Sequence, residues 1–192
     1  RLFTRIGLNS GEMTAGYMGS ENKKNYTMMG NNVNLASRLE GVNKQYSTGG
    51  ILMSEATRDM LGDRFLVRSL DRVQVVNVTT PIRLYELIDE KANVTEEMTK
   101  FVDAWEQTMK VFEKGDYAKA LELFKKLSAA RPSDNVAKYY VPLIEKFFIK
   151  GIYPTAKDDF GVEYNAENPE GMKPEWVGTK YEIKGTFKLL QK

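Results

Sequence analysis

The residues with the clearest chemical pattern in this sequence are Asn34 and Arg38, four positions apart in the segment 26–39. This segment reads as a short strand, a turn at Gly30 and then a helix with an apolar stripe. Residues four apart lie on the same face of a helix. A guanidinium offers several donors in a rigid fork to phosphoryl oxygens, and an amide can orient a ribose without adding charge. The pair is therefore a candidate site for a ribose and a phosphate.

The composition limits what else could do chemistry. The chain of 192 residues contains no histidine and no cysteine, which excludes the commonest general base, thiolate nucleophiles and metal sites built from these residues. Its 28 basic and 26 acidic residues give a net charge of +2, so we expect no nucleic-acid partner. No apolar run approaches the ~20 residues of a membrane span. Because the chain begins with Arg inside a strand-like segment, we expect it to be a piece of a longer protein. We expect a cytoplasmic location, with any membrane anchor in upstream regions.

The elements that must position the pair are short strands around two helices within residues 1–90. Ser54 is the expected N-cap of the second helix. The last two strands are expected to form a hairpin. The methionines are expected to fill the core, because their flexible side chains suit irregular gaps. The expected strands cover residues 2–9, 13–18, 25–29, 51–53, 65–70, 72–78 and 82–88, the expected helices cover 33–42 and 55–61, and the methionines are Met13, Met18, Met28, Met29 and Met53.

The domain organisation follows from changes in composition along the chain. The polar stretch 89–93 is the best boundary, so residues 1–90 form the first expected domain. An all-α hairpin is expected over residues 95–150, with helical segments at 96–114, 117–130 and 135–150. Residues 151–192 are expected to be an irregular tail that ends in one strand, because residues 181–189 alternate between apolar and polar side chains.

Five pieces of the first domain resemble, in order, the C-terminal half of a class III adenylate/guanylate cyclase catalytic domain. The Asn-x-x-x-Arg helix lies at the centre of this match. The resemblance implies an α+β fold, a ferredoxin-like half-domain whose antiparallel-rich sheet has its helices on one face, followed here by the helical hairpin and a short C-terminal β segment. The matching pieces are residues 5–12, 15–20, 26–39, 51–57 and 81–87.

The resemblance also implies a reaction and roles for three residues. The family converts a nucleoside triphosphate to a cyclic nucleotide and pyrophosphate by attack of the ribose 3′-oxygen on the α-phosphorus. The residue matching Asn34 orients the ribose, and the one matching Arg38 stabilises the negative charge of the transition state. The residue matching Thr27 reads the purine edge, and a threonine there leans towards ATP. The implied function is an adenylate cyclase that makes cyclic AMP for intracellular signalling.

Two departures from the family pattern restrict this expectation. The family binds two Mg or Mn ions through two aspartates that lie upstream of residue 2, so the ligands are not in this chain and the fragment alone is expected to be inactive. The usual triphosphate lysine is replaced within residues 76–78, Val-Asn-Val. In the family two domains meet head to tail, so a homodimer with sites at its interface is implied, with Asn34 and Arg38 acting in trans on ATP. The alternative is a non-catalytic cyclase-homology scaffold that mediates dimerisation or partner binding.

The helical region carries a weaker resemblance to a tetratricopeptide repeat. Ala120, Phe124 and Pro132 stand at the spacing of the second helix of that repeat. One reading is a helical hairpin that packs on the cyclase half, and the other is a module that binds a peptide or protein partner. We favour the first, because only one repeat is visible and stable arrays need about three. The tail resembles no family.

Overall fold

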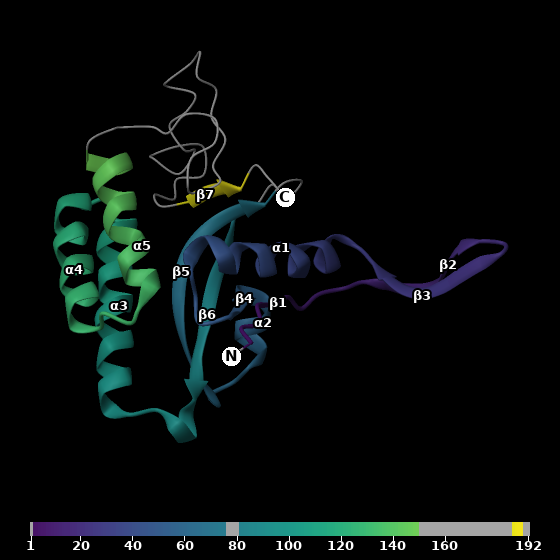
Figure 1. The fold of residues 1–192 in the computed structure, drawn as a ribbon, viewed down its shortest axis with the longest axis horizontal. Helices are drawn as coiled ribbons and strands as arrows, with labels where there is room; N and C mark the ends of the chain where they lie inside the picture. The colour runs from purple at the N-terminus through teal and green to yellow at the C-terminus, as the bar shows by residue number, and fades with distance from the viewer. Residues whose placement is uncertain (1, 76–80, 150–185, 190–192) are drawn as a thin grey trace, which may run out of the picture.

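A five-stranded mixed sheet forms the centre of the molecule (Figure 1). The computed structural model describes residues 2–75, 81–149 and 186–189 of the chain. The strands follow the order β1-β4-β6-β5-β7, with antiparallel pairing around β6 and parallel pairing of β1 with β4 and of β5 with β7. The strands are β1 (Ile6–Leu8), β4 (Ile51–Ser54), β5 (Phe65–Val75), β6 (Ile82–Glu90) and β7 (Thr186–Leu189).

Strand β5 runs through a point where the sequence predicted a break. Residues 65–75, where the sequence predicted the end of one strand and the start of the next, form one strand, with an irregularity in its pairing to β6 between Ser69 and Arg72. An extra residue on one strand of an antiparallel pair bends that strand without ending it. The expected residues 76–78 and most of the tail, 150–185 and 190–192, lie outside the described residues.

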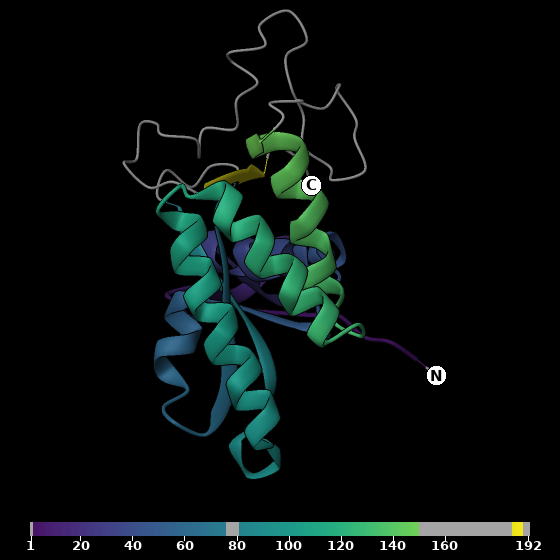
Figure 2. The same ribbon diagram turned by 90° about the vertical axis from the view of Figure 1, so that its left-hand side faces the viewer.

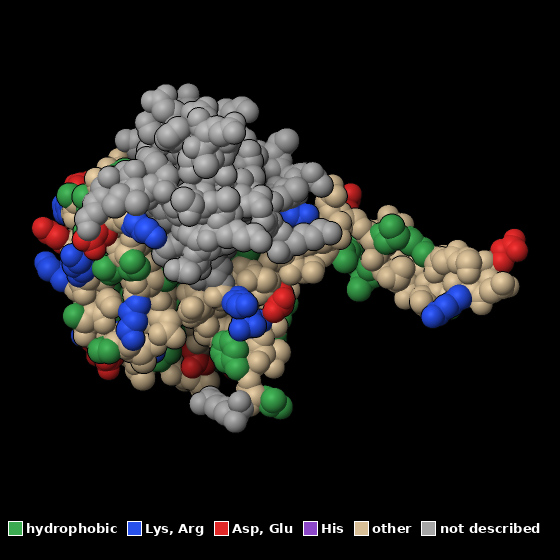
Figure 3. Space-filling view, turned by 45° about the horizontal axis from the view of Figure 1, so that its top comes forward, with side chains coloured by type: hydrophobic (Ala, Val, Ile, Leu, Met, Phe, Trp, Pro, Cys, Tyr) green, Lys and Arg blue, Asp and Glu red, His purple; other side chains and the backbone are tan. Residues whose placement is uncertain are grey.

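A two-stranded antiparallel hairpin extends away from this body (Figure 1). It consists of β2 (Thr14–Ser20) and β3 (Lys23–Met29). The rings of Tyr17 and Tyr26 meet edge to face across it, with centroids 5.2 Å apart. The expectation that the methionines fill the core is wrong for the hairpin, because Met28 and Met29 are exposed, and it holds for Met53 in β4. Figure 3 shows hydrophobic side chains along this arm and charged side chains near its end.

Helix α1 (Asn31–Tyr46) covers one face of the sheet. It buries Leu35, Leu39, Val42 and Tyr46, a stripe at helical spacing. The helix approaches β1 very closely, because a Cβ built on Gly7 would lie 2.2 Å from a backbone oxygen of α1. Glycine is therefore required at this position.

Helix α2 (Glu55–Met60) lies on the other face. The Ser54 side chain caps it by accepting from the Thr57 N–H at 3.4 Å, as expected. The Arg58 guanidinium lies 5.4 Å from the ring centroid of Tyr85. Tyr85 points away from its buried neighbour Leu84, since successive strand residues face opposite sides. The expectation that the helices lie on one face is therefore wrong for α2, which covers the side of β4 and β6 that α1 leaves open.

Three further helices form a layer beside the sheet (Figure 2), in which the first packs on β5, the third meets α1, and the second lies against the other two. Pro142 lies inside the third helix, which continues past it as a π-helical turn (Ile144–Ile149) instead of remaining α-helical to residue 150. A proline removes one backbone donor from the helix, which is consistent with this change of pitch. The helices are α3 (Glu96–Glu113), α4 (Tyr117–Ala130) and α5 (Asn135–Leu143), preceded by a short 3-10 turn (Lys91–Asn93). None of the described helices is long and apolar enough to cross a membrane.

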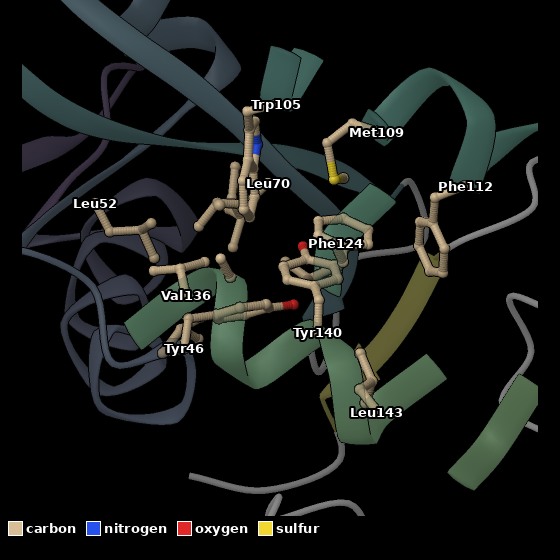
Figure 4. Packing of buried hydrophobic residues seen from close by; sticks show 14 of the residues in the cluster. Tyr46, Leu52, Leu70, Trp105, Met109, Phe112, Phe124, Val136, Tyr140 and Leu143 are labelled. Carbon is tan, nitrogen blue, oxygen red and sulfur yellow. The ribbon is translucent and has the colours of Figure 1, made fainter. Parts of the chain in front are cut away.

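One hydrophobic core joins α1 and the sheet to these three helices (Figure 4). The ring of Tyr140 from α5 stacks on Phe124 of α4 at 4.6 Å and meets Trp105 of α3 edge to face at 5.4 Å. Leu52 and Leu70 of the sheet belong to the same buried cluster. The helical segment and the sheet are therefore packed together without a layer of water between them.

Candidate active site

The candidate residues lie where β3 passes through Gly30 into α1. Gly30 has φ 141°, a conformation that favours glycine. The backbone N–H of Asn34 donates to the Gly30 carbonyl at 3.1 Å, so Asn34 lies in the first turn of α1. Arg38 follows one turn later on the same face, half-buried, whereas Asn34 is exposed. Among the described residues, neither side chain has a hydrogen-bond or ion-pair partner.

Thr27 lies apart from this face, on the hairpin. It pairs with Gly16 of β2, towards the end of the hairpin that adjoins α1, and it is exposed. The structure therefore brings Asn34 and Arg38 together on one helix and leaves Thr27 on the neighbouring arm.

A polar network fixes the first turn of α1. The Asn9 amide donates to the backbone oxygen and to Oδ1 of Asn32, both at 3.1 Å. Asn32 in turn donates to the Glu12 carbonyl at 2.9 Å, and Ser54 donates to Asn9 Oδ1 at 2.6 Å. Gly11 leaves room for the Asn32 amide, which a Cβ there would meet at 2.3 Å. Sequence analysis missed Asn9 and Asn32, although an asparagine directly before Ser-Gly and another at the helix start were visible signals.

A second set of hydrogen bonds fixes the other end of α1. The Asn43 amide donates to the Ile6 carbonyl at 2.9 Å and to the Leu39 carbonyl at 3.2 Å. The Tyr46 hydroxyl donates to Oδ2 of Asp71 at 2.9 Å. Burial raises the pKa of the Asp71 carboxyl to about 8, an effect that the hydrogen bonds of neighbouring tyrosines only partly offset. Both ends of the helix that carries the pair are therefore anchored to the sheet.

The described residues do not fit a metal site. No group of three or more aspartates and glutamates converges among them. Glu12, Glu55, Asp59 and Asp63 belong to no such group. What the arrangement itself offers is an amide and a guanidinium on one face of α1.

Comparisons with known proteins show what the first part of this chain is similar to. Residues 1–89 match the family model of the adenylate and guanylate cyclase catalytic domain. An adenylate cyclase of Dictyostelium discoideum, specific to terminal differentiation, is 30% identical over 142 residues. Adenylate cyclase 1 of Rhizobium meliloti is 36% identical over 85 residues. A crystal structure of an adenylyl cyclase from P. aeruginosa is 32% identical, with a TM-score of 0.42, over 47% of this chain and 45% of that one. The first part of the chain is thus similar to the catalytic domain of adenylate and guanylate cyclases.

The matched segments make up a much larger share of this chain than of either relative. The Dictyostelium match takes in 72% of this chain but only 7% of that protein, and the Rhizobium match 44% and 13%. The chain therefore spans a small part of these relatives. The Dictyostelium match also extends beyond residues 1–89 into the helical segment. It takes in 72% of the chain, whereas residues 1–89 are less than half of its 192 residues.

Proposed function

We propose that this chain supplies the ribose- and phosphate-binding half of an adenylate cyclase active site, which converts ATP to cyclic AMP and pyrophosphate for signalling in the cytoplasm. The observation that carries the proposal is the pair Asn34 and Arg38, which shares one face of a helix anchored at both ends and has no protein partner among the described residues. The match of residues 1–89 to the cyclase family model supports it.

The reaction places defined demands on these two side chains. The ribose 3′-oxygen forms a bond to the α-phosphorus, the bond from that phosphorus to the β-phosphate oxygen breaks, and the 3′-hydroxyl proton is released to solvent. Asn34 holds the ribose so that its 3′-oxygen points at the phosphorus. The Arg38 guanidinium donates to the phosphoryl oxygens, on which negative charge accumulates in the transition state. Thr27, on β3 of the neighbouring arm, reads the purine edge and leans towards ATP, because its hydroxyl can accept a hydrogen bond from the adenine amino group.

A second chain completes the site. In this proposal the two aspartates and their Mg or Mn ions come from a cyclase half that contains the upstream region, either of a second copy of the longer protein or of another cyclase, and the two halves meet head to tail. The exposed side chains of Tyr17, Tyr26, Met28 and Met29 support this arrangement, because an arm with such a surface is suited to cover a partner. The fragment alone is expected to be inactive.

A mixing experiment tests this function. The chain is combined with an aspartate-bearing N-terminal half of a class III catalytic domain, ATP and manganese, and cyclic AMP is measured. We expect product from the mixture and none from either half alone. An inactive mixture whose halves bind each other would contradict the proposal.

That outcome would favour the second candidate, a non-catalytic cyclase-homology scaffold. The residues 76–78, Val-Asn-Val in place of the usual lysine segment, are the observation in its favour. In that case the helical segment would serve as the surface for a protein partner.

A further inference from the structure

A buried charged bridge joins the sheet to the helical segment. Arg68 of β5 lies between Glu86 of β6 and Asp134 at the start of α5, with nitrogen–oxygen distances of 2.6 Å to each. The three side chains are only 3%, 3% and 8% exposed. The Arg68 guanidinium also lies 4.4 Å from the ring centroid of Trp105 in α3. Separating such charges in a buried setting is costly, so the bridge holds α5 in one position.

Both ends of this bridge reach main-chain groups of other elements. Glu86 Oε1 accepts from the Gly49 N–H at 2.5 Å, in the loop that follows α1. Asp134 Oδ1 accepts from the Ala137 N–H at 2.8 Å and so caps α5, while its Oδ2 binds Arg68. An unbroken chain of hydrogen bonds therefore runs from the loop after α1 to the first turn of α5.

Helix α5 also touches the end of α1 directly. The ring of Tyr46, the last residue of α1, lies 5.1 Å from that of Tyr139 and 6.3 Å from that of Tyr140. Tyr46 is at the same time hydrogen-bonded to Asp71 in β5. The C-terminal end of α1 thus depends on α5 through two independent sets of contacts.

We propose that α5 is a positioning element of the cyclase site: its docking on Arg68 holds the C-terminal end of α1 and so sets the placement of Asn34 and Arg38. This inference rests on the proposed function. Since a helix moves largely as a rigid rod, releasing one end of α1 shifts the face that carries the pair. An event that loosens α5 then lowers the rate of cyclisation without touching the nucleotide. The helical segment is in this view a regulatory part of the catalytic unit.

The substitution Asp134→Asn tests the coupling, with Asp116→Asn as the matched control. Asparagine caps helices as well as aspartate does, so α5 keeps its cap while Arg68 loses one of its two carboxylates. Asp116 caps α4 by accepting from the Lys119 N–H at 3.2 Å and pairs with no arginine among the described residues. Hydrogen exchange of the full chain is measured for each variant by mass spectrometry. The Asp134→Asn chain is expected to exchange about tenfold faster over residues 39–50, which corresponds to ~1.4 kcal/mol, and the control is not.

Other outcomes would overturn the inference. Faster exchange confined to residues 134–149 would show that α5 loosens without affecting α1. If Asp134→Asn fails to fold, hydrogen exchange over residues 39–50 is measured in Arg68→Lys instead. This variant keeps the positive charge but loses the guanidinium fork that binds both carboxylates.

The catalytic readout separates this inference from the proposed function. In an active mixture, Asp134→Asn is expected to lower kcat and leave KM unchanged, and an unchanged kcat would contradict the regulatory role. If the wild-type mixture makes no product, the proposed function fails, while the exchange data still decide whether α5 holds α1.

Discussion

Tyr46 and Asp71 form a hydrogen bond of 2.9 Å in the centre of the protein, where α1, β5 and α5 meet. Both side chains are buried, and the second carboxyl oxygen of Asp71 has no hydrogen-bond partner among the described residues. The Tyr140 hydroxyl is buried beside the same carboxyl and interacts with it, at a geometry outside that of a regular hydrogen bond. A carboxyl in such surroundings favours its neutral form.

This pair predicts a pH-dependent stability. Burial raises the pKa of Asp71 from 3.8 to about 8 in the folded chain. Between these two values the folded chain holds a proton that the unfolded chain has lost. The stabilisation of the fold by the protonated Asp71 is therefore complete below pH 3.8 and is lost as the pH rises towards 8. The slope reaches at most ~1.4 kcal/mol per pH unit. Urea unfolding at several pH values measures it.

The matched variant is Asp71→Asn, which keeps an acceptor for Tyr46 and cannot titrate. We expect its advantage over the wild type to grow with pH across this interval. If the two stability curves run parallel, Asp71 does not titrate between them and the interpretation of this buried carboxyl is wrong.

Replacing Gly7 of β1 or Gly41 of α1 by alanine should change the stability of the fold in opposite directions. A Cβ on Gly7 would lie 2.2 Å from the Ala36 oxygen and 2.4 Å from the Glu40 nitrogen, so Gly7→Ala should push α1 away from β1 and destabilise by ~1–3 kcal/mol. Gly41, inside α1, has nothing within 4 Å of its Cβ position, so Gly41→Ala should stabilise by ~0.5–1 kcal/mol. Urea unfolding of both variants checks the signs. Equal effects would refute the close approach of α1 and β1.

The hairpin residue Thr27 predicts a change in nucleotide use. Removing its hydroxyl as Thr27→Val should lower kcat/KM for ATP about 2- to 10-fold in the mixed assay, the worth of one hydrogen bond. Thr14→Val is the control, because Thr14 is exposed on the partner strand of the same hairpin. A rate with ATP that stays the same in both variants would mean that Thr27 does not contact the purine.

Local patterns in the sequence were sufficient to predict part of this structure. The spacing of Asn34 and Arg38 places them on one helix face, because that relation depends only on helical periodicity. The cap at Ser54 was predicted for the same reason, since its partner Thr57 is three residues away. Residues 117–130 were expected to be helical, and α4 has these bounds.

Long-range relations could not be predicted in this way. Arg68 and Asp134 are 66 residues apart, and no sequence pattern pairs them. Asp71 looked like a polar break between strands, but the three elements packed around it bury its carboxyl. The methionines of the hairpin were expected in the core because composition says nothing of an arm that leaves the body.

The central claim is that Arg38 stabilises the transition state of cyclisation. The most direct measurement is the rate of cyclic AMP formation by the mixture, with Arg38→Ala compared with wild type. Arg58→Ala is the control, since Arg58 is an exposed arginine of α2 whose ion-pair partner is its neighbour Asp59. The account predicts that Arg38→Ala lowers kcat by ~10²–10³-fold and that Arg58→Ala leaves it unchanged. Equal rates for wild type and Arg38→Ala would contradict it.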